Sequence, residues 1–219
     1  MAKLSRRKMM AAGAGAVPFL GLAAVARGQQ GAQARSDEKM NYEDPGLAAC
    51  LLIKGRKQIE VCKFALEKIS HEDVKKFANA EIEEHVTLKK RLQELGYEYP
   101  SPVAGSREDR KEGVALNVGR APIGAGAGRL IAIDHEVADQ CIATTKAEQG
   151  KLQGVEFDKR FVGSQLDAHY ALFDHGVVFR KHASAEMAPI LDEARTIIER
   201  HIATCKELMS RLEMAKGTK

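Results

Sequence analysis

The sequence has no tryptophan, and aromatic residues make up only 5% of its 219 positions. Alanine, leucine, glutamate, lysine and arginine are abundant instead, which is typical of helical proteins. A CxxC or CxxCH motif is also missing, which excludes a zinc ribbon, a thioredoxin site and covalently attached haem. The four cysteines, Cys50, Cys62, Cys141 and Cys205, are expected to be buried small apolar residues, with disulfides as the alternative in an oxidising compartment.

The chain has no apolar run long enough to predict a membrane anchor. The run over residues 11–25 spans about 15 residues, against the ~20 that a spanning helix needs. Basic residues precede it, Arg6 and Arg7 among them, and the small residues Ala24-Val25-Ala26 follow. This pattern predicts a cleaved export signal over residues 1–26 that resembles the twin-arginine type, with an ordinary secretory signal as the alternative. We therefore expect a periplasmic or secreted bacterial protein with no membrane span after cleavage.

The mature chain also lacks an excess of charge of one sign. The whole sequence has a formal charge of +4, and the predicted signal contains four basic residues and no acidic one. Cleavage therefore leaves a net charge near zero, which excludes the basic surface typical of nucleic-acid binding. The partners we expect are a second copy of the chain or another envelope protein. Residues 27–43, rich in Gln, Gly and charge, are predicted to form a flexible tether.

Apolar periodicity predicts an all-α bundle over residues 44–215, with no sheet. Pro45 opens the first helix, Ser70 and Asp73 cap the second, and Gly96 ends it. The proline- and glycine-rich residues 97–129 predict a long crossover, and their glycine-rich stretch 123–128 lacks the preceding strand of a nucleotide-binding loop. The architecture expected is two helical hairpins with an extra helix and this crossover. The five predicted helices span residues 45–69, 70–95, 130–152, 155–182 and 185–212.

Three of these helices have polar residues on apolar seams. In the second helix, Glu81 and His85 occupy seam positions that the pattern alone would make apolar. His169 lies on the apolar stripe of the fourth helix, one turn after Gln165. His201 is the only strongly polar member of the seam that runs from Met187 to Leu212. We predict that His85, His169 and His201 converge inside the bundle.

Several short segments resemble an uncharacterised ferritin-like family, domain of unknown function 4142. The segments are Ile59-Glu60-Val61, Phe77-Ala78, Glu84-His85, Glu156-Phe157-Asp158, Gln165, His169 and His201, in that order. The resemblance covers residues 45–212 and implies an exported ferritin-like four-helix bundle without an established activity. It also implies that the recurrent acidic and histidine positions are Glu60, Glu84, His85, His169 and His201. This chain departs from the family at Glu81, where an apolar residue is more common, and near Ile197, where a proline is usual.

The residues also bear on the chemistry of the site. A dinuclear carboxylate centre needs Glu-x-x-His motifs, and this sequence has none: Ile82, Leu166 and Ile198 stand three residues before the seam histidines. One transition-metal ion, Fe, Mn, Zn or Cu, fits the donors better, without haem or nucleotide. The candidate ligands are His85, His169, His201, Glu81, Glu84 and Glu60.

Three functions remain open, and no catalytic residue is assigned. The first is a metal-binding bundle. The second is a non-catalytic envelope interaction or scaffold module, in which a structural His/Glu cluster only specifies packing. The third is a mononuclear metalloenzyme of the superoxide-consuming type. Metal analysis of the purified protein separates the second function from the other two.

The export prediction can be tested on the secreted chain. We expect mass spectrometry of the periplasmic protein to find an N-terminus near Arg27. Replacing Arg6 and Arg7 together by lysine should stop export, because the twin-arginine pathway reads this pair. Export that is unchanged in the lysine variant would leave the ordinary secretory signal as the correct interpretation.

Overall fold

The computed structural model describes residues 43–100, 123 and 125–214, which belong to one compact unit. This part of the chain contains five helices and no strand, so the predicted all-α class is confirmed. The export signal, the tether apart from residue 43, and most of the crossover lie outside the described residues. The helices are α2 (Asp44–Leu66), α3 (Glu72–Glu94), α4 (Ala125–Gln149), α5 (Gly154–Phe179) and α6 (Ala188–Met214).

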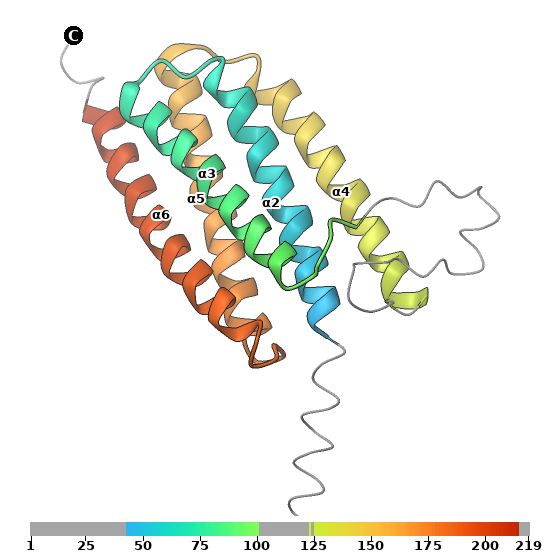
Figure 1. Ribbon diagram of the computed structural model, residues 1–219. Coiled ribbons are helices and arrows are strands. Elements are labelled where there is room, and N and C mark those ends of the chain that lie inside the picture. The colour runs from blue at the N-terminus through green and yellow to red at the C-terminus, as the bar shows by residue number, and fades with distance from the viewer. Residues whose placement is uncertain (1–42, 101–122, 124, 215–219) are drawn as a thin grey trace, which may run out of the picture. The chain divides into compact units, whose positions relative to one another are not determined.

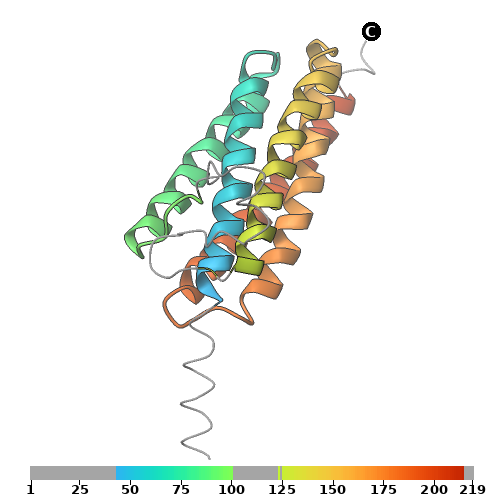
Figure 2. The ribbon, with the colours of Figure 1, turned by 90° about the vertical axis from the view of Figure 1, so that its right-hand side faces the viewer.

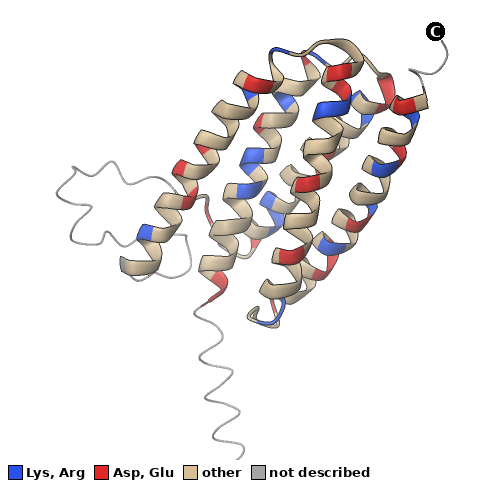
Figure 3. Cartoon of the chain, turned by 180° about the vertical axis from the view of Figure 1, so that it is seen from behind, with Lys and Arg blue, Asp and Glu red and all other residues tan. Residues whose placement is uncertain are grey.

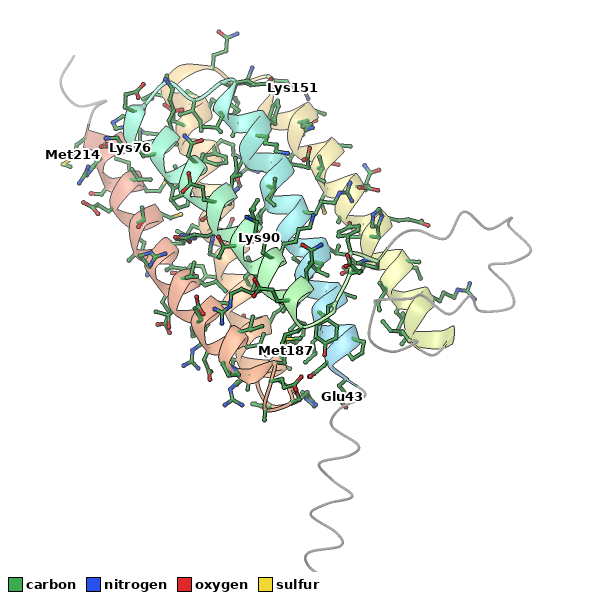
Figure 4. The ribbon with its side chains drawn as sticks, viewed as in Figure 1. Glu43, Lys76, Lys90, Lys151, Met187 and Met214 are labelled. Carbon is green, nitrogen blue, oxygen red and sulfur yellow. The ribbon has the colours of Figure 1, made fainter. Side chains whose placement is uncertain are left out.

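Two antiparallel hairpins, α2 with α3 and α5 with α6, lie side by side as predicted (Figures 1 and 2). The hairpins meet where α3 packs against α6. Helix α4 lies outside the hairpins along α2 and returns the chain along their length, from the end of α3 to the start of α5. Figure 4 shows Glu43 and Met187 at one end of the bundle and Lys76 and Met214 near the other.

The turn between α2 and α3 differs from the predicted cap. His71 caps α3, because its Nδ1 accepts the backbone N–H of Asp73 at 3.2 Å. Ser70 instead turns to α5, where Asp158 accepts its N–H at 3.0 Å and its hydroxyl at 2.5 Å. The end of α3 follows the prediction, since Gly96 has a φ of 84°, a value that glycine adopts without strain.

Helix α4 begins at Ala125, five residues earlier than the predicted 130. Glycine lowers helix propensity by about 1 kcal/mol, but here it alternates with alanine, the best helix former. The crossover therefore ends earlier in the sequence than predicted. Two side chains of α4 contact Arg56 of α2, which lies 3.1 Å from Nε2 of His135 and pairs with Asp139. Arg56 also donates to Tyr99 at 3.1 Å.

The interior of the two hairpins is layered. One apolar cluster fills the end at the α2–α3 turn and includes Phe77, Phe157 and Phe161. A second fills the opposite end and includes Leu92 and Leu191. Between them lies a polar layer, whose members are all at most 5% exposed: Gln58, Glu81, Gln165, His169 and His201.

The surface carries both signs of charge. Lysine and arginine are interspersed with aspartate and glutamate along the helices in Figure 3. Within the described residues no helix is both long and apolar enough to cross a membrane.

The cysteines follow the prediction only in part. Cys62 and Cys205 are fully buried in the first apolar cluster, and burial raises the pKa of the Cys205 thiol to about 12. Cys50 is half-buried and Cys141 is exposed, so the expectation of burial is wrong for Cys141. All four are free thiols. Cys141 lies on the outer helix α4, where the hairpins do not cover it.

The contact between Asp158 and the α2–α3 turn generates a prediction. Asp158 is fully buried and also accepts the N–H of His71 at 3.0 Å. We expect Asp158→Ala to lower the free energy of unfolding by about 2 to 4 kcal/mol, because three donors lose a charged acceptor. Urea denaturation measures this loss. Asp167→Ala, an exposed carboxylate on the same helix, is the control and should change stability by less than about 0.5 kcal/mol. Equal effects of the two substitutions would contradict the assigned role.

Candidate metal centre

Glu81 lies at the centre of the polar layer, and its side chain is fully buried. Its Oε1 lies 2.9 Å from Nε2 of His169 and 2.6 Å from Nδ1 of His201. The two ring nitrogens are 3.1 Å apart. These three residues, which we call the Glu81 triad, come from α3, α5 and α6 and form a buried group that could hold a metal ion.

The helices hold both imidazoles from the side opposite Glu81. Nδ1 of His169 lies 2.7 Å from the carbonyl oxygen of Gln165, one turn earlier in α5. Since a carbonyl only accepts, Nδ1 must carry the proton, and Nε2 of a neutral His169 presents a lone pair to the triad. Nε2 of His201 lies 2.6 Å from Oε2 of Glu84. This carboxylate favours a proton on Nε2, so that Nδ1 presents the second lone pair.

Ring nitrogens lie close to the Glu81 carboxylate, but none of them is aligned with it as a hydrogen-bond donor. Neither of its oxygens has a hydrogen-bond partner by distance and angle together, although ring nitrogens lie within 3 Å of Oε1. Oε2 of Glu84 shares this property despite its close contact with His201. We therefore treat these contacts as electrostatic. A fully buried carboxylate without directed donors is costly unless a positive charge lies beside it.

The electrostatics of the triad favour a charged pair in the metal-free protein. Burial opposes ionisation of Glu81, but its contacts with His169, His201 and His85 outweigh burial and hold its pKa well below the usual range. Burial likewise lowers the pKa of His169, and the neighbouring Glu81 more than reverses this, so that the pKa is raised overall. The triad attracts protons and would attract another cation for the same reason.

The predicted residues outside the triad take two different positions. His85 reaches the same carboxylate from its other side, with Nε2 3.5 Å from Oε2 of Glu81. Glu84 contacts the distal nitrogen of His201 and also pairs with Arg200 at the surface. Both therefore surround the triad and do not belong to it. His85, His169 and His201 converge inside the bundle as predicted, and the residue that all three contact is Glu81, with His85 the most distant.

Glu60 does not join the cluster. Its side chain is 37% exposed and pairs with Lys63 at 3.1 Å on the outer side of α2. The contribution of α2 to the polar layer comes from Gln58, whose amide donates to Oε1 of Gln165 at 2.9 Å. We did not identify Gln58 from the sequence, because apolar residues occur nearly all round this helix.

Phe77 shields the two ligand candidates from the first apolar cluster. Its ring centroid lies 6.4 Å from that of His169 and 5.6 Å from that of His201. Interplanar angles of 56° and 79° bring the edge of one ring toward the face of the other. Phe77 restricts the rotation of both imidazoles and excludes water from this side of the triad.

The raised pKa of His169 can be tested in metal-free protein. We expect Glu81→Gln to lower this pKa, because it removes the neighbouring charge that contributes most to opposing the effect of burial. NMR titration of the His169 ring protons measures it. Because the folded-state pKa is raised in the parent, the pairing stabilises the fold fully below the unfolded pKa of about 6.5 and is lost as pH rises through the folded value. Glu83→Gln, an exposed neighbour, is the control; an unchanged pKa in Glu81→Gln would contradict the assignment.

Comparisons with protein-family models, with curated proteins and with solved structures found no match. The geometry of the Glu81 triad and its surroundings is therefore the basis on which we assign a function.

Proposed function

We propose that this protein binds one transition-metal ion through Oε1 of Glu81, Nε2 of His169 and Nδ1 of His201. Two imidazoles and one carboxylate suit Zn, Fe, Mn or Cu, and sites of this composition serve as catalytic zinc centres and as mononuclear non-haem iron centres. The absence of Glu-x-x-His motifs argues against a dinuclear centre.

The observation that carries the proposal is the convergence of three acceptors without a donor. The Gln165 carbonyl and the Glu84 carboxylate each occupy the far nitrogen of one ring, which leaves two lone pairs and a carboxylate oxygen facing one another. Second-sphere oxygens that fix the tautomer in this way are typical of metal-ligating histidines. One divalent ion satisfies all three acceptors, whereas protons satisfy them only by charging buried imidazoles.

The distances within the triad also support an ion. Bonds of about 2.0 to 2.1 Å place neighbouring ligands of an octahedral ion about 2.9 Å apart, and those of a tetrahedral ion about 3.4 Å apart. The three edges of the triad measure 2.6, 2.9 and 3.1 Å. They are close to one face of an octahedron, an arrangement that leaves further positions open to exogenous ligands. His85, beside the second oxygen of Glu81, orients that carboxylate.

The proposal places this metal site in an exported ferritin-like bundle. The order of two hairpins with a returning segment between them supports a ferritin-like connection. The resemblance to domain of unknown function 4142 and the twin-arginine-like signal support export to the periplasm. The scaffold function has less support, because without a metal the cluster is satisfied only by a charged imidazole in the core, which is a costly way to specify packing. Open coordination positions on the ion would permit an enzymatic role, but we assign no reaction to this site.

Metal uptake provides the direct test. We expect protein stripped by a chelator and dialysed against Fe(II), Mn(II), Zn(II) or Cu(II) to retain one equivalent, measured by inductively coupled plasma mass spectrometry. A saturating metal should also raise the free energy of unfolding, by about 2.7 kcal/mol at a free concentration 100 times Kd. Glu81→Gln and His201→Asn, with folding checked by circular dichroism, should lose the metal and its stabilisation.

Glu60→Gln is the matched control, because it removes a glutamate of the same bundle that lies outside the triad. It should retain one equivalent of metal. Loss of metal from Glu60→Gln, or full retention by Glu81→Gln, would show that the ligands are wrongly assigned. Parent protein that takes up none of the four metals would leave the cluster with a structural role.

A further inference from the structure

A cavity of about 120 Å³ lies between α2, α3, α5 and α6, and the rings of His169 and His201 form part of its wall. His85 and Glu84 line it beside them. Most of the remaining wall is apolar and includes Leu88, Leu172, Ile197 and Ile198. A water molecule accounts for about 30 Å³ of the liquid, so the cavity has room for a ligand of a few heavy atoms. It meets the triad on the side away from Phe77's apolar cluster.

The wall of the cavity has more unpaired positive charge than unpaired negative charge. Both acidic members are already paired, Glu84 with Arg200 and Glu193 with Arg91. Two basic members, Lys54 on α2 and Arg195 on α6, form no ion pair or hydrogen bond among residues 43–100, 123 and 125–214. A divalent ion at the triad adds a further net positive charge, since Glu81 neutralises only one of its two. Low-dielectric walls strengthen the resulting field.

From these features we infer that the cavity admits a small inorganic monoanion, of two or three heavy atoms, to an open position on the bound metal ion. The inference rests on the proposed metal site and names the class of ligand that this site takes. Excess positive charge selects an anion. The small volume and the apolar wall exclude ligands with several polar groups, which would lose hydration without new partners. His85, half-buried at the same wall, is placed to contact the bound anion.

Azide is the probe, because it is a triatomic monoanion that produces a charge-transfer band on Cu(II) and shifts the visible bands of Co(II). We expect azide to change the spectrum of Cu(II)- or Co(II)-loaded protein saturably at one site. Lys54→Glu and Arg195→Glu should each raise the Kd for azide about tenfold while metal stoichiometry remains at one. Lys181→Glu reverses an exposed charge outside the cavity wall and should change the Kd less than about twofold at the same ionic strength.

Two glycines of α5 provide a second matched pair that tests the cavity itself. Gly176 lines the cavity, Gly163 does not, and a Cβ built on either meets nothing within 4 Å. Gly176→Leu should therefore fill space beside the triad and weaken azide binding at least tenfold, whereas Gly163→Leu should not. Both variants should retain the metal.

The outcomes separate this inference from the proposed function. A parent protein that takes up no metal overturns both. Metal-loaded protein whose spectrum azide leaves unchanged overturns the anion inference alone, as does a Lys181→Glu effect as large as that of Arg195→Glu. Azide binding that Gly176→Leu leaves unaltered shows that the anion does not enter through this cavity and equally overturns the inference.

Discussion

The buried carboxylate of Glu81 is the constraint on which the interior of this bundle depends. A charged group with no exposed surface is costly in a helical core, and replacement by an apolar side chain would remove that cost. The bundle instead surrounds Glu81 with His85, His169 and His201 from three helices. His169 and His201 require Glu81 in turn, because either imidazole left without it would be buried with an unsatisfied nitrogen.

This requirement also fixes how the two hairpins align. Apolar clusters at the two ends of the bundle tolerate small shifts of one helix against another, since apolar contacts have little direction. The polar layer between them does not, because Glu81 belongs to the first hairpin while His169 and His201 belong to the second. The hydrogen bond between Gln58 and Gln165 crosses the same boundary. A sliding of one turn would separate all these pairs at once.

The sequence predicts the five helices well because each has a long periodic pattern, and it predicts His169 and His201 because a polar residue on an apolar seam is conspicuous. It fails where a partner is distant in the chain. Ser70 donates its hydroxyl to Asp158, 88 residues away in the chain, and His71 caps α3 in its place. Glu60 was implied as a ligand by the family resemblance, whereas its side chain pairs with Lys63 on the outer side of α2.

The contacts of His201 with two carboxylates connect the interior to the surface. One of its nitrogens faces the fully buried Glu81, and the other faces Glu84, which in turn pairs with the exposed Arg200. His169 has no such connection, because its far nitrogen ends on a helix carbonyl. The two rings therefore differ in what orients them: His201 contacts a carboxylate that reaches the surface, while His169 contacts a backbone carbonyl of its own helix. A cation at the triad would have one ligand oriented by the interior of α5 and one oriented by the surface pair of Glu84 and Arg200.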